Sequence, residues 1–200
     1  MRRGVGASSR PGRRWLARAA LVVALIPLAS GCSVLGGLSQ QGLQAPRVMT
    51  VTSPAFGPDV SLPRQYTCHG AGLSPPLQWS GAPAQRARSF AIVVDDSATP
   101  IEPYVYWIVF DISGSTIAIP QNGLPPGARQ ARNSRGQIGY DPPCPVGGPH
   151  RYRFTVYALN VARLAGPHGV LGPGASLTAA WQAIAPHVIA VGRLTASANP

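Results

Sequence analysis

The sequence predicts a mainly β fold, an antiparallel sandwich with one short helix near the carboxyl end. Glycine and proline supply 23 and 22 of the 200 residues, which disfavours long helices and suits short strands joined by turns. Strand patterns outnumber the single helical pattern and do not alternate with helices, which argues against βαβ units. Hydrophobic residues make up 45% of the chain, enough for one core and too many for wholesale disorder.

The first 31 residues are typical of a bacterial secretion signal. Six arginines precede an apolar run over residues 19–29. A helix needs about 20 apolar residues to span a bilayer, so this run is too short. Small residues then lead into Cys32, as in a lipobox, where the chain is cut before the cysteine and two or more acyl chains anchor it. An uncleaved signal anchor or an ordinary signal peptide is the alternative, and the export route, Sec or twin-arginine, stays open.

Residues 32–46 are rich in Gly, Ser and Gln without a sustained period, which predicts a flexible tether to a domain over residues 47–200. The expected location is the extracytoplasmic face of the cell membrane. Six of the 17 arginines precede Cys32, so 11 arginines and six acids remain, a formal charge of +5. These arginines are scattered, which disfavours nucleic-acid binding and is more consistent with attraction to anionic lipid headgroups.

Strand patterns follow in order along the domain. Residues 48–51 predict a short strand, ended by a proline-containing turn. Residues 89–94 and 104–112 are apolar nearly throughout and predict two central strands, and residues 115–119 are expected to add a short one. Simple alternation in the second central strand places four side chains on one face: Tyr104, Tyr106, Ile108 and Phe110.

The strongest strand pattern begins at His150, directly after a loop rich in proline and glycine. Successive side chains point to opposite faces. The inward face is expected to carry His150, Tyr152, Phe154, Val156 and Ala158, and the other face Arg151, Arg153, Thr155 and Tyr157. A histidine and a tyrosine therefore point together into the space that the preceding loop closes, which makes this strand end the best candidate for a binding site.

The carboxyl end contains the helical pattern. Ser176 is expected to cap a helix over residues 177–185, which Pro186 ends, and residues 187–194 return to strand character. Residues 120–140 form a long connection, and connections of that length in compact domains usually carry function or mobility.

Two cysteines remain once Cys32 is assigned to lipid. In an exported, oxidising setting Cys68 and Cys144 are expected to form a disulfide that closes a loop of 76 residues and stabilises the fold. Such a bond typically contributes about 2–4 kcal/mol. The alternative is two buried free thiols too far apart to bridge.

Several catalytic and metal-binding motifs are missing from the sequence. It contains no GxSxG, HExxH, GxxxxGK[ST] or CxxC pattern, so we expect neither an enzyme nor a cofactor. The four histidines, His69, His150, His168 and His187, show no ligand spacing, which disfavours a metal site.

Polar groups at strand ends remain as the candidate ligand-binding residues. If their strands are neighbours, Asp95, Tyr106, His150 and Tyr152 converge. Asp95 would fix the tautomer of His150 and raise its pKa, and the two phenols would donate hydrogen bonds, a set that suits a phosphate or carboxylate group. The alternatives are that Asp95 caps a turn, that His150 is an ordinary hydrogen-bonded loop residue and that the tyrosines only pack.

Short segments along the domain carry a resemblance to a known family. They are, in order, Ser53-Pro54-Ala55-Phe56, Leu62-Pro63 with Tyr66-Thr67-Cys68, Ser74-Pro75-Pro76-Leu77 with Trp79, Ser89-Phe90-Ala91, the stretch 133–140 ending in Gly139-Tyr140, Pro143-Cys144-Pro145, and His150-Arg151-Tyr152 with Tyr157-Ala158-Leu159. From about residue 48 to residue 194 the chain resembles the bacterial branch of the phosphatidylethanolamine-binding protein family, also called Raf-kinase-inhibitor-like.

The resemblance implies a Greek-key β-sandwich with a small pocket for phosphate-like anions or phospholipid headgroups. It implies that Asp95, His150 and Tyr152 line the pocket and that Pro142 and Pro143 form a wall. Two departures stand out. The family's Asp-Pro-Asp-Ala-Pro segment is Asp95-Asp96-Ser97-Ala98-Thr99-Pro100 here, and Tyr106 replaces a histidine before the strand tryptophan. A phenol cannot carry positive charge, so affinity for a dianion should fall or ligand preference should change.

Three functions follow from these expectations. The first is a membrane-tethered module that binds a small anionic or phospholipid-like ligand. The second is a protein-interaction module, resembling relatives that restrain kinases or proteases, which acts through residues 120–140. The third is a hydrolase with Asp95 and His150 as an acid–base pair, which lacks an accompanying nucleophile motif. The sequence specifies no particular ligand, protein partner or oligomeric state.

Overall fold

The computed structural model of the protein describes residues 47–96, 103–145, 150–166 and 169–198. The signal segment, Cys32 and the tether predicted for residues 32–46 lie outside the described residues. In the part of the chain that is described, no helix combines the length and the hydropathy needed to cross a bilayer.

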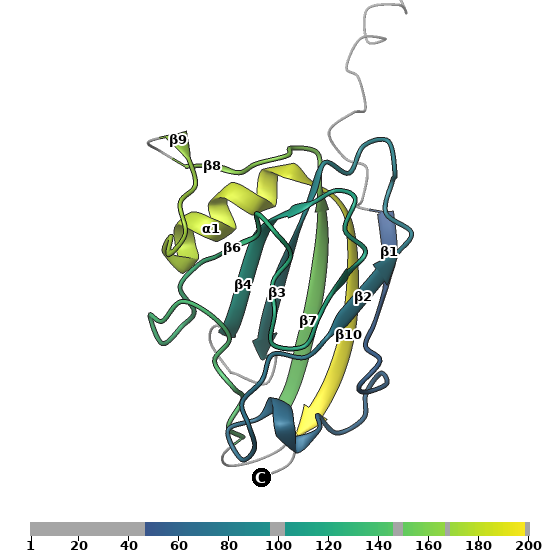
Figure 1. The fold of residues 1–200 in the computed structure, drawn as a ribbon, viewed down its shortest axis with the longest axis vertical. Helices are drawn as coiled ribbons and strands as arrows, with labels where there is room; N and C mark the ends of the chain where they lie inside the picture. Colours follow the sequence, from purple (N-terminus) through teal and green to yellow (C-terminus); the bar gives the residue numbers. More distant parts are fainter. Residues whose placement is uncertain (1–46, 97–102, 146–149, 167–168, 199–200) are drawn as a thin grey trace, which may run out of the picture. The chain divides into compact units, whose positions relative to one another are not determined.

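Strands dominate the described residues, and one α-helix lies near the carboxyl end (Figure 1). The elements are β1 (Arg47–Thr52), η2 (Arg64–Tyr66), β2 (Leu77–Ser80), β3 (Ser89–Asp96), β4 (Tyr104–Ser113), β5 (Ala118–Ile119), β6 (Arg129–Gln130), β7 (His150–Leu159), β8 (Ala165–Gly166), β9 (Gly169–Val170), α1 (Leu177–Ile184), η3 (Ala185–His187) and β10 (Val188–Ala198). The mainly β fold with a short helix is thus confirmed. The sequence patterns missed β2 and the two-residue strands β6, β8 and β9.

Eight strands form one curled sheet in the order β5-β2-β1-β10-β7-β3-β4-β6. The curl occurs at β1, whose first half pairs with β10 and whose second half pairs with β2. The β1–β10 pairing is parallel, unlike the antiparallel arrangement predicted. Parallel neighbours need a long crossover connection, and here the whole chain between the first and last strands supplies it. Gly192 permits the close approach of these strands, since a Cβ there would lie 2.6 Å from the Met49 carbonyl oxygen.

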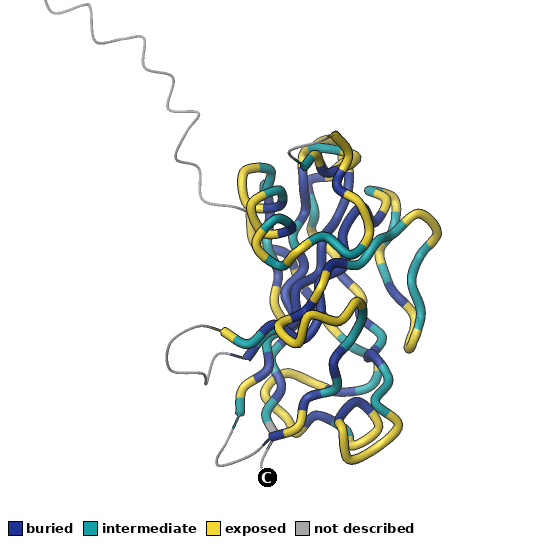
Figure 2. Tube along the Cα trace, turned by 90° about the vertical axis from the view of Figure 1, so that its left-hand side faces the viewer, coloured by how far each residue is buried: buried dark blue, intermediate teal, exposed yellow. Residues whose placement is uncertain are grey.

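The curled sheet encloses one core and carries a second on its outer face. The first core packs β2 against β3 and β7, with the Trp79 and Phe90 rings 5.3 Å apart. The second core packs Ala180 and Ile184 of α1 against the opposite face of the sheet. Figure 2 shows buried segments concentrated along the strands and exposed segments in the loops. Each large apolar side chain that is fully buried contributes roughly 1.5–3 kcal/mol.

Strand β7 confirms the predicted alternation. Tyr152, Phe154 and Val156 lie in the first core, while Tyr157 packs on the second. Polar and charged residues on the second face are tolerated because that face is only partly covered.

Strand β4 departs from the alternation predicted for residues 104–112. Tyr106 and Trp107 both belong to the first core, while Ile108 and Phe110 belong to the second. The pairing with β3 changes register between Val94 and Asp95, so Tyr106 is an extra residue opposite β3. A β-bulge of this kind rotates the following side chains to the other face.

The helix and the disulfide agree with expectation. The Ser176 side chain accepts a hydrogen bond from the Ala179 amide at 3.1 Å, which begins α1. Cys68 and Cys144 are bonded, with their Cα atoms 5.2 Å apart. The disulfide therefore joins the turn after η2 to the loop that leads into β7.

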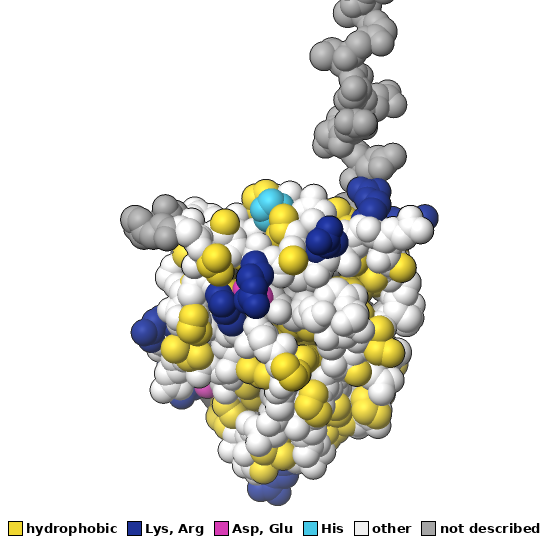
Figure 3. Space-filling view, turned by 45° about the horizontal axis from the view of Figure 1, so that its top comes forward, with side chains coloured by type: hydrophobic (Ala, Val, Ile, Leu, Met, Phe, Trp, Pro, Cys, Tyr) yellow, Lys and Arg dark blue, Asp and Glu magenta, His cyan; other side chains and the backbone are white. Residues whose placement is uncertain are grey.

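Arginine side chains are distributed over the surface in separate small groups on the face that Figure 3 shows. Asp111 is buried between two of them, with Arg129 at 3.7 Å and Arg163 at 3.8 Å. This distribution agrees with the scattered arginines of the sequence and differs from the continuous basic surface of many nucleic-acid-binding proteins.

Candidate ligand-binding site

The end of β3, the beginning of β7 and the end of β10 lie together, at the opposite end of the sheet from α1 (Figure 1). The pairing register sets Asp96 opposite Tyr152 and Ala198 opposite His150. Because directly paired residues project to the same face, the side chains of Asp96 and Tyr152 point into the curled sheet together. We call Asp96, Tyr106, His150 and Tyr152 the strand-end site.

His150 is held by a buried carboxylate. Its Nδ1 atom lies 2.5 Å from Oδ2 of Asp96, whose side chain is fully buried, while 22% of the His150 side chain is exposed. A short contact of this kind fixes the ring orientation and favours a proton on Nδ1. The imidazole is thus oriented by the protein and still reachable from solvent.

The carboxylate predicted for this position, Asp95, lies elsewhere. It pairs with Arg153 in the register, and its two oxygens accept hydrogen bonds from Nε and an Nη atom of Arg153 at 2.6 Å each. Neighbouring residues of a strand point to opposite faces, so Asp95 faces away from His150. The expected Asp95–His150 pair is therefore wrong, and with it the hydrolase hypothesis in the form that needed this pair.

A row of three aromatic rings begins beside the oriented imidazole. The His150 and Tyr152 rings are nearly parallel, at 9° with centroids 6.1 Å apart. Tyr106 meets Tyr152 edge to face at 5.5 Å, and Tyr104 lies 4.7 Å from Tyr106. The structure thus brings together three of the predicted residues, Tyr106, His150 and Tyr152. The bulge in β4 is what turns Tyr106 toward them.

Both site tyrosines are hydrogen-bond donors over the physiological range. Burial raises the pKa of Tyr106 and of Tyr152, and the negative charge of Asp96 raises the pKa of both further. The Tyr152 side chain is fully buried, yet its hydroxyl makes no hydrogen bond of acceptable geometry within the described residues. The nearby Tyr106 hydroxyl lowers the pKa of Tyr152, but by less than burial and Asp96 raise it. A buried hydroxyl without a partner is destabilising by about 1–3 kcal/mol.

A second buried carboxylate, Asp141, was missed by the sequence reasoning. Its Oδ2 accepts a hydrogen bond from the Tyr104 hydroxyl at 2.8 Å and lies 3.2 Å from Nε of Arg135. Its backbone amide donates to the Tyr106 carbonyl at 2.9 Å. Asp141 lies in a loop without a period, so only its position beside the two prolines could have drawn attention to it.

Pro142 and Pro143, the predicted wall, follow Asp141 directly. Pro142 packs on Gly72 so closely that a Cβ atom added to Gly72 would lie 2.8 Å from the Cγ atom of Pro142. The Pro143 carbonyl accepts a hydrogen bond from the Cys68 amide at 3.0 Å. The disulfide at Cys144 and this bond fix the loop beside the strand-end site. Residues 97–102 and 146–149, on either side of the site in sequence, lie outside the described residues.

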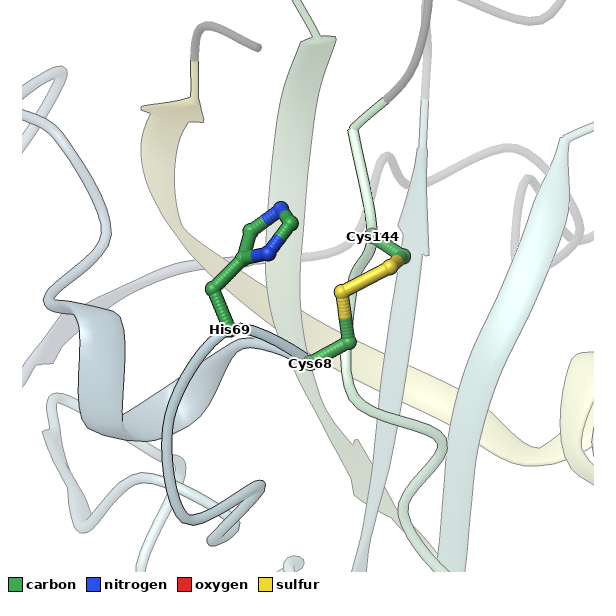
Figure 4. Close-up of side chains that lie close together, drawn as sticks. All are labelled: Cys68, His69 and Cys144. Atoms are coloured by element: carbon green, nitrogen blue, oxygen red, sulfur yellow. A yellow bond between two sulfur atoms is a disulfide. The ribbon is translucent and has the colours of Figure 1, made fainter.

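His69 lies beside the disulfide (Figure 4). The potential ligand atoms of Cys68, His69 and Cys144 are within 4.8 Å of one another. Because the two sulfur atoms are bonded to each other, neither is a thiolate that could hold a metal ion in this state.

Comparison with known proteins agrees with the fold. A family model described as phosphatidylethanolamine-binding protein matches residues 52–199. The chain belongs to this family, which confirms the resemblance seen in the sequence.

Curated relatives include proteins of archaea and bacteria. A UPF0098 protein of Methanothermobacter thermautotrophicus is 35% identical over 151 residues, which cover 73% of this chain and 95% of that protein. A Mycobacterium tuberculosis protein named "Putative lipoprotein LppC" is 41% identical over 139 residues, covering 68% of this chain and 65% of that one.

Solved structures share the fold over most of the domain. A homologue of phosphatidylethanolamine-binding proteins from Chlamydia trachomatis has a TM-score of 0.68 and 32% identity, covering 77% of this chain and 99% of its own. YbcL of Escherichia coli, described as a member of the mammalian PEBP family, has a TM-score of 0.69 and 27% identity, covering 76% and 98%.

Proposed function

We propose that the domain binds a small anionic group, a phosphate or a phospholipid headgroup, at the strand-end site. The observation that carries this proposal is the buried Tyr152 hydroxyl, which has no hydrogen-bond partner within the described residues and lies beside an oriented imidazole. Buried polar groups are normally hydrogen-bonded. An oxygen of a bound anion would accept from this hydroxyl and remove the cost of leaving it unpaired.

The charges at the site favour a monoanion or a zwitterion over a dianion. When His150 is protonated, its charge is balanced by Asp96 at 2.5 Å. Tyr106 occupies the position where the family has a second imidazole, and burial keeps its hydroxyl neutral by raising its pKa. The site therefore offers hydrogen-bond donors without a net positive charge, which suits the phosphodiester of a zwitterionic headgroup such as that of phosphatidylethanolamine better than a dianion.

The proposed cellular setting is the outer surface of the cell membrane, with the domain tethered through lipid on Cys32. The relative named as a lipoprotein supports this setting. A tethered domain of this kind would meet phospholipid headgroups at high local concentration.

The protein-interaction alternative uses the connection over residues 120–140. This connection is anchored to the domain, since Gln130 accepts a hydrogen bond from the Trp107 indole at 2.6 Å and the Arg132 amide donates to the Ala175 carbonyl at 2.8 Å. It also exposes Ile138, at 52% of its surface. Protein binding that survives His150→Ala while ligand binding disappears would favour this function.

Titration calorimetry with glycerophosphoethanolamine tests the proposal. The protein is full-length and held in lipid nanodiscs, and empty nanodiscs give the blank. Tyr152→Phe removes only the hydroxyl and should weaken binding by about tenfold or more, as expected for a hydrogen bond to a charged group. His69→Ala, which alters an exposed histidine beside the disulfide, is the matched control and should bind normally. Equal affinity in wild type and Tyr152→Phe would contradict the proposal.

A further inference from the structure

A separate cavity of about 480 Å³ lies on the outer face of the sheet, beside α1. Its apolar lining includes Val93, Val105 and Ile108 from the sheet and Leu177 and Trp181 from α1. Val93 and Val105 belong to the second core, where they keep 6% and 9% of their surface exposed. Small-molecule sites are typically concave and mostly apolar, with volumes of about 300–1,000 Å³. We call this the helix-side cavity.

The polar end of the cavity carries two guanidinium groups and one carboxylate. Arg153 is satisfied by Asp95 through two hydrogen bonds of 2.6 Å. Arg193 also lines the cavity, and its Nε atom donates to the Thr155 hydroxyl at 3.0 Å. Among the described residues, no carboxylate lies within ion-pairing distance of Arg193. The described lining therefore has an excess of one positive charge.

An aromatic pair borders this polar end. Tyr157 and Trp181 meet edge to face with their centroids 5.6 Å apart. Trp181 leaves 44% of its surface exposed, although it is a large apolar side chain. Tyr157 is in contact with the second core, so burial keeps its hydroxyl protonated by raising its pKa, an effect that Arg193 partly offsets. The pair thus offers an exposed apolar surface and a neutral donor next to a cation.

We propose that the helix-side cavity binds an amphipathic monoanion, a carboxylate joined to a short acyl chain. The carboxylate would pair with Arg193, and the chain would cover Trp181, Leu177 and the valine floor. This site is independent of the strand-end site, because Asp95 and Arg153 project to the opposite face of the sheet from Asp96 and Tyr152. Such a ligand gains affinity both from apolar burial and from its ion pair with Arg193. Acetate lacks the apolar chain, and a cationic chain lacks the carboxylate.

Octanoate binding to full-length protein in nanodiscs tests this site, followed by tryptophan fluorescence and by calorimetry against empty nanodiscs. Octanoate should bind saturably, whereas acetate and octyltrimethylammonium should bind at least about tenfold more weakly. Arg193→Gln should weaken octanoate by about tenfold or more, the effect expected for loss of a hydrogen bond to a charged group. Arg86→Gln, which changes an exposed arginine outside the cavity lining, should have no effect.

A second variant tests the apolar part of the site without changing charge. Leu177→Trp adds bulk to the cavity wall and should also weaken octanoate, while the thermal midpoint reports whether each variant is folded. His150→Ala should leave octanoate affinity unchanged. Unchanged affinity in Arg193→Gln and in Leu177→Trp would overturn the proposal, and so would loss of octanoate binding in His150→Ala alone, since it would place the anion in the strand-end site.

Discussion

Where β3 pairs with β7, each face of the sheet carries one aspartate with a basic partner. Asp96 contacts His150 on the inner face, and Asp95 contacts Arg153 on the outer face. Asp96 is fully buried against His150, whose ring lies nearly parallel to that of Tyr152. Asp95 is partly exposed and bonded at both oxygens to Arg153. Two adjacent aspartates therefore do different things: Asp96 orients an imidazole inside the curled sheet, and Asp95 neutralises a cation on the outer face.

A shift of one residue along β3 therefore decides which face an aspartate lies on and which partner it contacts. Paired carboxylate and guanidinium groups satisfy each other and leave little for a ligand. On the inner face, the buried Tyr152 hydroxyl has no hydrogen-bond partner within the described residues, and a buried donor of this kind favours binding an acceptor. On the outer face, the cation available for a ligand is Arg193 and not Arg153.

Removing the two carboxylates one at a time should give the largest contrast. Asp96→Ala removes a short hydrogen bond between His150 and a fully buried carboxylate, and loss of a hydrogen bond to a charged group should lower the free energy of unfolding by about 2–3 kcal/mol. Asp95→Ala leaves Arg153 with access to water and should cost about 1–2 kcal/mol. Urea denaturation measures both values. Equal losses, or a larger loss for Asp95→Ala, would contradict the assignment of the two faces.

The disulfide should stabilise the strand-end side specifically. Replacing both Cys68 and Cys144 by Ser should lower the free energy of unfolding by about 2–4 kcal/mol. It should also weaken headgroup binding, because the bond fixes the loop that holds Pro143, and it should leave octanoate binding intact. Thermal denaturation and the two titrations measure these effects. A double variant that loses octanoate binding and keeps headgroup binding would contradict this prediction.

Alkaline pH should destabilise the protein through the buried tyrosines. Burial raises the pKa values of Tyr106 and Tyr152 in the folded protein above the ordinary tyrosine value of about 10. Below pH 10 both states keep the proton and the stability is fully present; above it the unfolded chain ionises first, so stability is lost by up to about 1.4 kcal/mol per pH unit for each tyrosine. Unfolding followed between pH 9 and pH 11 should show this loss. Tyr152→Phe should have a shallower dependence, and an identical slope would count against the assignment.

Tyr152→Phe at neutral pH should change the free energy of unfolding least, and the change should be zero or stabilising. Removing a buried hydroxyl that has no partner within the described residues should leave the unliganded protein as stable as before, or more stable by about 1 kcal/mol. Headgroup binding should fall in the same variant. Matched denaturation of Tyr157→Phe on the outer face is the comparison. A clear loss of stability in Tyr152→Phe would show that the hydroxyl is already satisfied.

The sequence predicted those parts of the site that depend on strand periodicity. The alternation of β7 placed His150 and Tyr152 on the inner face because a core excludes the charged residues between them. It could not decide between Asp95 and Asp96, since both follow the same apolar run and only the pairing register with β7 separates them. The bulge that turns Tyr106 inward depends on tertiary pairing, and Asp141 lies in a loop, where no period identifies buried residues.

The measurement that tests the central claim most directly is ³¹P NMR of glycerophosphoethanolamine titrated with full-length wild-type, His150→Ala and Arg193→Gln protein. We predict that wild type and Arg193→Gln broaden or shift the phosphorus resonance alike and that His150→Ala abolishes the effect. A response that survives in His150→Ala and disappears in Arg193→Gln would contradict the account, because it would move anion recognition to the outer face of the sheet.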